Sequence, residues 1–331
     1  MKRGGGSRER GGQVPGEPSA RSTAPFPSPG SQFPAPEGIV PSLAELIALR
    51  RAALRARDPR RGQRGVSARA TSAQRGRGME YAESREYVAG DDARHIDWKL
   101  SARTGFTHTK TFQAERERLT LLVADTAPAL YFGTRTRFKS VQAARAGAVA
   151  AWSALRDGDR VAALCGGRED GLVPPAGGMR GVLRVLDALV RWYRTPPAGG
   201  ADGLQSALER ATRLLHPGAR ALVLADPASA LAVAPATWSA LSMHVDVRLL
   251  LLVDPLEMQP PQCLLPVAMP GGRMELDLAA GAVRDAWHAA FVAPVETLCD
   301  TLPGRRIRVQ VLASDEASDA WLGAAPARAG A

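Results

Sequence analysis

The sequence predicts an α/β protein built on a doubly wound, mainly parallel sheet of the Rossmann type. Short apolar runs alternate with longer segments whose apolar residues recur every three or four positions. Two of the runs are uninterrupted and close on a carboxylate, LTLLVAD at Asp125 and RALVLAD at Asp226. Buried parallel strands have this appearance because helices cover both faces of a parallel sheet. A charged extension precedes the predicted sheet.

The first half of the sheet is expected to begin at Leu119. After it, apolar residues from Phe138 to Leu155 fall at steps of three and four, which predicts a helix that Asp157 and Gly158 close. The expected elements are a strand over 119–125, a helix over 138–155, a strand over 160–165, helices over 179–193 and 204–215, and a strand over 220–225.

The second half continues the alternation to the last strand. We expect a short helix over 237–243, a strand over 245–253, a proline-rich excursion, and a helix through Val283, Trp287 and Phe291. Pro294 should end or kink that helix, because proline lacks the amide hydrogen that a helix interior needs. Ile307, Val309 and Val311 alternate with polar residues, which predicts a half-exposed strand at the sheet edge.

Charge and composition divide the chain into five parts. Residues 1–78 hold 15 basic and 5 acidic residues, so the whole net charge of +10 lies there. Their first half is rich in proline, glycine and serine and cannot bury enough apolar surface to fold. Ser42 and Glu45 open a short helix. We expect a disordered arm over 1–40, a helix and arginine-rich linker over 41–78, a charged segment over 79–118, the sheet domain over 119–315 and a flexible tail over 316–331.

Several classes of protein are disfavoured by the sequence. Three separated cysteines lack metal-ligand spacing, and no apolar run reaches the ~18 residues that span a bilayer. We therefore expect a soluble cytoplasmic protein. The arginine-rich stretch over 50–64 has no interleaved aromatic residue, so nucleic acid is an unlikely partner. Neither a phosphate-binding loop nor a nucleophile elbow occurs, and we expect no catalytic residues.

The charged segment, GMEYAESREYVAGDDARHIDWKLSARTGFTHTKTFQAERE, mixes both signs of charge with aromatic residues. Two interpretations remain open. The charges form ion pairs that fasten the segment to the sheet domain, or part of the network faces outward and contacts a partner protein. The candidate binding residues are Arg85, Glu86, Tyr87, Gly90, Asp91, Asp92, Arg94, Asp97, Trp98 and Arg103.

The edge of the sheet where its strands end is the second candidate site. If the strands that close on Asp125 and Asp226 are both central and parallel, the two acids lie at the same edge. Ligands meet such sheets where the strand order reverses, because the connecting loops diverge there. This edge is a plausible cation or partner site.

The motif G-D-D-x-R-x-I-D-W over 90–98, the runs over 75–118 and 121–164, and DPLE over 254–257 resemble a bacterial family, domain of unknown function 58. The resemblance covers residues 65–315. It implies a von Willebrand factor A-like fold and an association with MoxR-type AAA+ ATPases. The implied function is that of a non-catalytic adaptor or co-chaperone that binds such an ATPase, a client protein or both.

The same resemblance bears on metal binding. Asp125 matches the first residue of the D-x-S-x-S metal motif of A-type domains, but Ala127 and Ala129 replace both serines, and residues 166–180 contain no threonine. Asp226 matches the remaining aspartate. The implied site is degenerate and would hold Mg²⁺ weakly, or its aspartates cap neighbouring loops instead. The alternative function is a divalent-metal-dependent hydrolase using Asp125 and Asp226 with Asp91 or Asp92.

Overall fold

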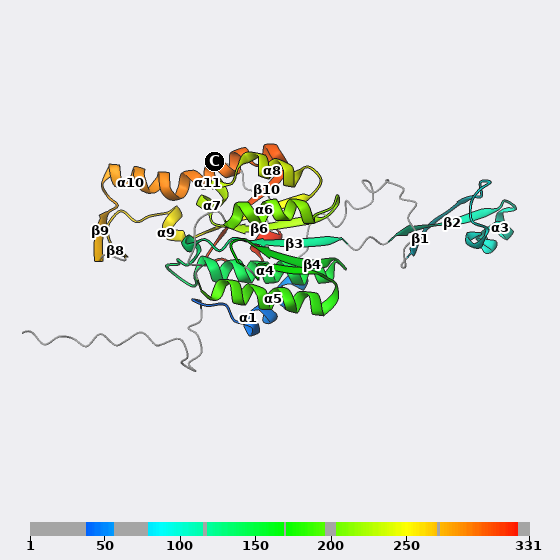
Figure 1. Ribbon diagram of the computed structural model, residues 1–331, viewed down its shortest axis with the longest axis horizontal. Helices are drawn as coiled ribbons and strands as arrows, with labels where there is room; N and C mark the ends of the chain where they lie inside the picture. The colour runs from blue at the N-terminus through cyan, green and yellow to red at the C-terminus, as the bar shows by residue number, and fades with distance from the viewer. Residues whose placement is uncertain are drawn as a thin grey trace, which may run out of the picture. The chain divides into compact units, whose positions relative to one another are not determined.

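The centre of the protein is a six-stranded sheet flanked by helices, as the computed structural model shows (Figure 1). The structure describes residues 38–55, 79–114, 118–168, 170–195, 203–269 and 272–323 of the 331. The strands of the sheet are β3 (Leu119–Ala124), β4 (Arg160–Cys165), β5 (Leu172–Ala176), β6 (Arg220–Ala225), β7 (Asp246–Val253) and β10 (Ile307–Ala313). The predicted mixed α/β class is confirmed.

The strand order is β10-β7-β6-β3-β4-β5, and every neighbouring pair is parallel except β4 with β5. The chain starts in the middle at β3, moves outward through β4 and β5, and returns on the other side through β6, β7 and β10. The order therefore reverses between β3 and β6. In a doubly wound sheet, the loops that follow the strands diverge at this position and leave a crevice where ligands bind.

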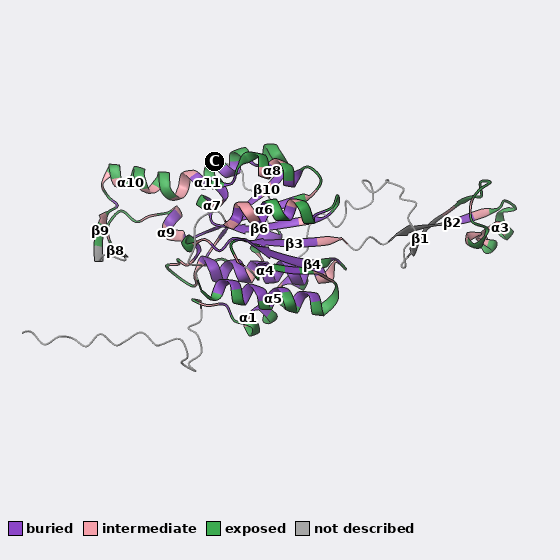
Figure 2. Ribbon diagram, in the orientation of Figure 1, coloured by how far each residue is buried: buried purple, intermediate pink, exposed green. Residues whose placement is uncertain are grey.

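One face of the sheet is covered by α4 (Lys139–Arg156) and α5 (Gly178–Arg194), with α1 (Leu43–Ala48) and α2 (Arg50–Arg55) packed outside them. Nearly all of α4 is buried, since the sheet and the outer helices enclose it (Figure 2). Small residues such as Gly147 allow this approach, because a Cβ there would lie 3.0 Å from a methyl group of Leu189. Trp152 Nε1 donates to the Leu46 carbonyl at 3.0 Å and joins α1 to α4.

The other face carries α6 (Gly203–Leu214), α7 (Pro227–Ala232), α8 (Pro235–Ser242) and α11 (Ala293–Thr301). Trp238 and Leu298 are buried in this second core with the apolar side chains of β6 and β7. The two cores lie on opposite faces of the sheet, so each central strand is apolar on both sides. The uninterrupted apolar runs follow from this burial.

The remaining elements stand outside the central sheet. The charged segment forms an antiparallel pair, β1 (Met79–Glu86) with β2 (His108–Ala114), joined through η2 (Ala93–His95) and α3 (Trp98–Thr104). A second pair is β8 (Leu264–Met269) with β9 (Gly272–Asp277). Short helices complete the fold: η3 (Pro128–Leu130), α9 (Pro255–Met258), α10 (Gly281–Trp287), η4 (His288–Val292), η5 (Pro303–Arg305) and η6 (Ala320–Leu322).

Three predicted connections contain more structure than expected. The proline-rich excursion holds α9 and the β8–β9 pair, and α7 follows β6 directly. The segment after β4 adds β5, whose two consecutive prolines lie where its pairing with β4 is irregular, which an edge strand tolerates. Pro294 lies in the first turn of α11 and so begins a helix, while the preceding helix passes through the π-helical turn η4.

Three further predictions need correction. The short helix that Ser42 opens is followed by a second one, with Leu49 between them, and Ser42 caps the first by accepting from the Glu45 amide. The last strand lies at the sheet edge as predicted but is mostly buried. Residues 316–323 do not form a flexible tail, because Trp321 and Leu322 are buried against that strand and Gln310 donates to the Trp321 carbonyl. Burial of Trp321 and Leu322 and the hydrogen bond from Gln310 together oppose the entropy lost when these residues become ordered.

Residues 1–37 of the predicted arm over 1–40, residues 56–78 of the linker and residues 324–331 of the tail lie outside the described residues. Among the helices that the structure describes, none combines the length and the apolar character needed to span a membrane.

Candidate functional site

The carboxyl edge of the sheet brings the two predicted aspartates together. Asp125 follows β3 and Asp226 follows β6, and the Asp226 amide donates to Asp125 Oδ2 at 3.1 Å. Asp254 follows β7 at the same edge. All three carboxylates are buried. The expectation that both aspartates sit where the strand order reverses is therefore met in the structure.

The main feature of this edge is a lysine that the sequence analysis did not single out. Lys139 is 1% exposed, and its Nζ lies 2.8 Å from Asp226 Oδ2 and 2.6 Å from Glu257 Oε1. The ammonium group joins α4 to the starts of α7 and α9. We call Lys139, Asp226 and Glu257 the lysine triad.

Local structure places each member of the lysine triad. Lys139 is the first residue of α4, at the positive end of the helix dipole, where a cation is unfavourable without nearby anions. Glu257 is held by a capping box, because its Oε2 accepts the Asp254 amide at 2.8 Å. Burial opposes charging of Lys139, but the carboxylates of Asp226 and Glu257 raise its pKa above the usual value. Lys139 is therefore an ammonium ion in the folded protein.

Asp125 and Asp226 also cap backbone turns. Asp125 Oδ1 accepts from the Ala127 amide at 2.9 Å, and Asp226 Oδ1 accepts from the Ala228 amide at 2.9 Å. Burial raises the pKa of Asp125 to about 6, although these amide hydrogen bonds oppose the shift. The structure thus favours the interpretation in which the aspartates hydrogen-bond neighbouring loops.

Asp254 is held by a separate set of donors. Its carboxylate accepts from the hydroxyl of Thr134 at 2.5 Å, from the amide of Thr134 at 2.9 Å, and from the Ser314 hydroxyl at 2.7 Å. Burial works against its ionisation, but the hydrogen bonds from Thr134 and Ser314 hold its pKa below the usual value. Asp254 therefore fastens the loop before α4 to the end of β10.

The donor set does not fit a resident divalent cation. Magnesium requires six oxygen ligands in near-octahedral geometry, whereas one oxygen of Asp226 already contacts the ammonium of Lys139. A cation placed beside these carboxylates would meet a like charge, and Ala127 and Ala129 offer no hydroxyl. Within the described ranges, no cluster of three or more His, Cys, Asp or Glu side chains is arranged to bind a metal.

Two sequence signals could have identified Lys139. The chain uses lysine at only four positions, Lys2, Lys99, Lys110 and Lys139, and arginine at every other basic position. Lys139 is the only one of these after residue 110, and it opens a helix, where a basic residue is disfavoured. Its partner Glu257 belongs to DPLE, one of the runs on which the family resemblance rests. This run does not by itself reveal a contact with Lys139, which lies 118 positions earlier.

The charged segment has an internally hydrogen-bonded backbone. Asp97 caps α3 by accepting from the Leu100 amide at 3.1 Å, and the Ser84 hydroxyl donates to it at 3.0 Å. The Asp97 amide donates to the His108 carbonyl at 2.8 Å, and Ser101 accepts from the His108 amide at 2.8 Å. These bonds fix the connection between β1 and β2, residues 87–107, which we call the signature loop.

Other predicted residues serve the same loop. Asp91 forms an ion pair with Arg85 at 2.6 Å and accepts from the Val88 amide at 3.0 Å, while Asp92 accepts from the Arg94 amide at 3.0 Å. The Val88 amide and Arg85 hold the pKa of Asp91 below its usual value. Gly90 has φ +110°, a conformation that other residues rarely adopt. These contacts join residues of the charged segment to one another. The interpretation that ion pairs fasten this segment to the sheet domain stays a prediction.

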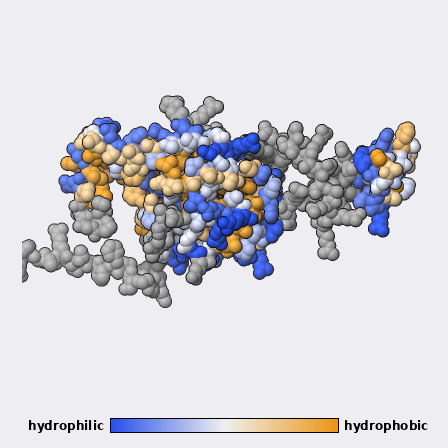
Figure 3. Space-filling model, turned by 45° about the horizontal axis from the view of Figure 1, so that its top comes forward, coloured by the Kyte–Doolittle hydropathy of each residue, from blue (hydrophilic) through white to orange (hydrophobic). Residues whose placement is uncertain are grey.

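Large apolar side chains of the signature loop are exposed. Trp98 is 72% exposed and Phe106 is 67% exposed, with Val88 and Tyr87 exposed nearby in the chain. The Tyr87 amide donates to the Thr107 carbonyl at 2.8 Å, which places both ends of the loop beside each other. Figure 3 shows hydrophobic surface on this unit among hydrophilic residues. Glu86, Arg94 and Arg103 are also exposed.

Comparison with known proteins identifies a family but no activity. The model of the family described as "Protein of unknown function DUF58" matches residues 83–294. Three mycobacterial proteins are each 28% identical to the chain over 215 residues, which is 63% of this chain and 64% of theirs. They are Uncharacterized protein Mb1516 of Mycobacterium bovis, and Uncharacterized proteins MT1527 and Rv1480 of Mycobacterium tuberculosis. The match thus spans a little under two thirds of the relatives. No solved structure matches the chain significantly.

Proposed function

The chain belongs to the DUF58 family of proteins of unknown function, and from this premise we propose that it is a non-catalytic adaptor. In this proposal a von Willebrand factor A-like domain carries the signature loop, and the loop binds a partner protein. The partner class is a MoxR-type AAA+ ATPase, its client protein or both, as the family resemblance suggests.

The observation that carries the proposal is the exposure of Trp98 and Phe106 on a loop with an ordered backbone. Aromatic residues are enriched at protein interfaces and supply most binding energy there. Exposed apolar groups cost solubility unless a partner covers them. The internal hydrogen bonds preorganise the loop, so little conformational entropy remains to be lost on binding.

The lysine triad supports the non-catalytic part of the proposal. Ligands of doubly wound sheets usually bind at the carboxyl edge, but here the chain's own Lys139 neutralises the carboxylates. Asp91 and Asp92, the further ligands of the alternative hydrolase, already accept hydrogen bonds from their own loop. Among the residues that the structure describes, no general base with a matching partner converges on Asp226. The alternative hydrolase therefore has little support from the geometry.

Affinity capture of the tagged full chain from its own cells tests the adaptor proposal. We expect an AAA+ ATPase to co-purify with the wild type and to be lost from the double variant Trp98→Ala/Phe106→Ala. The matched control is Met243→Ala, which removes a 65% exposed apolar side chain from the sheet domain. Capture of no partner protein by the wild type, or equal capture by the double variant, would overturn the proposal.

A thermal shift measurement tests the alternative. We expect the same melting temperature in magnesium and in chelator, because a ligand stabilises a protein only if it binds the folded state. A magnesium-dependent rise that disappears in Asp125→Ala, together with turnover abolished in Asp226→Ala, would establish the metal enzyme instead.

A further inference from the structure

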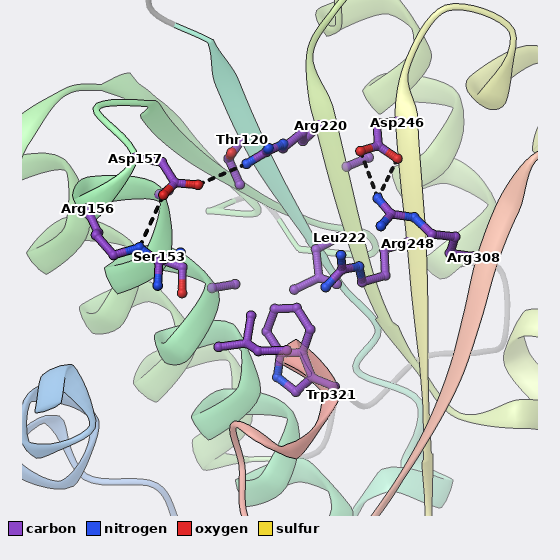
Figure 4. Close-up of a pocket in the computed structure, with 14 residues that line it drawn as sticks. Thr120, Ser153, Arg156, Asp157, Arg220, Leu222, Asp246, Arg248, Arg308 and Trp321 are labelled. Carbon is purple, nitrogen blue, oxygen red and sulfur yellow. Dashed lines mark hydrogen bonds and ion pairs between the residues drawn. The ribbon is translucent and has the colours of Figure 1, made fainter. Parts of the chain in front are cut away.

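The amino edge of the sheet contains a charged cavity opposite to the lysine triad (Figure 4). Its volume is about 70 Å³, and it lies between the first residues of β3, β6, β7 and β10, the end of α4, and η6. A volume of this size holds a few water molecules or one small oxyanion. The charged and polar residues that line it are Thr120, Ser153, Arg156, Asp157, Arg220, Asp246, Arg248 and Arg308. We call it the arginine pocket.

Strand register explains why arginines gather there. Arg248 on β7 pairs with Arg308 on the neighbouring strand β10, so their side chains leave the same face of the sheet. Arg220 pairs with Asp246, two residues before Arg248 and therefore on that face too. Like charges on adjacent strands destabilise a sheet. Asp246 compensates the charge of Arg308, and the ring of Trp321 lies beneath Arg248, so the register gathers these cationic groups at one place on this face.

The guanidinium groups of Arg220 and Arg308 use only part of their donors in contacts with the residues that the structure describes. Arg308 contacts Asp246 through Nη2 alone, at 2.6 and 2.7 Å, and Arg220 contacts Asp157 through Nη1 at 3.2 Å. Each guanidinium carries five N–H donors, so both side chains keep further donors near the cavity. Arg248 lies over the ring of Trp321, with 5.1 Å from its Cζ to the ring centroid, which orients it.

An unpaired hydroxyl provides an independent indication of a ligand. Ser153 is 8% exposed and lines the pocket, and its Oγ has no hydrogen-bond partner among the residues that the structure describes. A buried polar group without a partner costs free energy. A bound acceptor would satisfy it. Figure 4 shows Ser153 on α4 beside the pocket, on the side of Arg156 and Asp157.

We propose that the arginine pocket binds a phosphate-type oxyanion, with Arg220, Arg308 and Ser153 as its donors. Four arginines line the cavity together with two aspartates, Asp157 and Asp246. The donors come from β6, β10 and α4, three separate directions, which suits a tetrahedral anion better than a planar carboxylate. Arginine also matches phosphate geometry through its planar fork.

Isothermal titration of the full chain at constant ionic strength tests this proposal. The probes are inorganic phosphate, phenyl phosphate as a small phosphomonoester, and acetate as a planar anion. We expect phosphate to bind more tightly than acetate. Binding of the monoester as well would identify the ligand as a phosphoryl group of a larger molecule, and binding of phosphate alone would identify the free ion.

Two variants connect the binding to the pocket. Ser153→Ala should weaken phosphate binding about tenfold, the loss of one charge-assisted hydrogen bond. Arg308→Lys keeps the charge but removes the fork and should also weaken binding several-fold. The matched control is Ser140→Ala, since Ser140 is another buried serine of α4 whose Oγ has no partner among the described residues.

Thermal melting distinguishes this role from a structural one. Without phosphate, Ser153→Ala should melt at or above the wild-type temperature, because it removes an unsatisfied group. The proposal is overturned if the wild type binds no phosphate, if acetate binds equally well, or if the Ser153 and Ser140 variants bind alike. A Ser153→Ala variant that melts early without phosphate would also count against it.

Discussion

The two edges of the central sheet use buried charge in opposite ways. At the carboxyl edge, one lysine contacts two carboxylates, and Asp125 accepts backbone amides. At the amino edge, Arg220 on β6 and Arg308 on β10 use only part of their donors in contacts with the described residues, and a serine hydroxyl finds no partner among those residues. A buried ionic cluster therefore indicates a binding site only where it holds more hydrogen-bonding groups than the protein itself satisfies.

Side-chain chemistry accounts for the difference. The ammonium of lysine is compact and fits between two carboxylates as a point charge, while the guanidinium of arginine is planar and presents a fork of donors. Most basic residues of this chain are arginines, and Lys139, its only lysine after residue 110, lies in the lysine triad. Arginines line the arginine pocket at the other edge.

The largest expected effect on stability is at the lysine triad. Lys139→Met should lower the free energy of unfolding by about 3–5 kcal/mol, because two buried carboxylates lose their counter-ion. Urea denaturation measures the loss. The control Lys99→Met replaces an exposed lysine and should change stability by less than about 0.5 kcal/mol. If both variants unfold alike, the lysine triad is not a structural element.

The next effect concerns the indole beneath Arg248. Trp321→Ala should cost about 3–4 kcal/mol, because it leaves a large cavity against β7 and β10. Denaturation of this variant beside Trp98→Ala compares a buried and an exposed tryptophan. A negligible loss for Trp321→Ala would return residues 316–323 to the flexible tail that the sequence predicted.

A smaller effect depends on pH. The raised pKa of Asp125 means that the folded protein binds a proton more tightly than the unfolded chain. This contribution is fully present below about pH 4 and is lost as pH rises through about 6. The stability of the wild type relative to Asp125→Asn should therefore fall by on the order of 2–3 kcal/mol between pH 4 and pH 7. A constant difference between the two proteins across this range would contradict the assignment.

The smallest expected change in stability is at the signature loop. Trp98→Ala should alter the free energy of unfolding by less than about 0.5 kcal/mol, since its side chain is largely exposed. Calorimetry on the full chain provides the measurement. Early melting of Trp98→Ala would mean that this tryptophan supports the fold, as in the interpretation that fastens the segment to the sheet domain.

Local patterns were enough to predict the class of fold and the position of Asp125 and Asp226 at one edge of the sheet. Apolar runs located β3, β4, β6 and β7 closely, because burial on both faces leaves an uninterrupted apolar stretch. The same runs ended in Asp125 and Asp226, and parallel strands necessarily present such ends at one edge. The edge strand β5 and the β8–β9 pair escaped prediction, since proline, glycine and mixed polarity weaken the strand pattern there.

The contacts that these strand-end carboxylates make depend on the tertiary structure. Lys139 and Glu257 are separated by 118 residues and meet at 2.6 Å, and no periodicity encodes such a contact. The arginine pocket likewise depends on the register among β6, β7 and β10, together with a tryptophan near the C-terminus that the sequence assigned to a tail. Periodicity reports how one segment is buried, whereas the partner of a buried charge depends on which distant segments pack beside it.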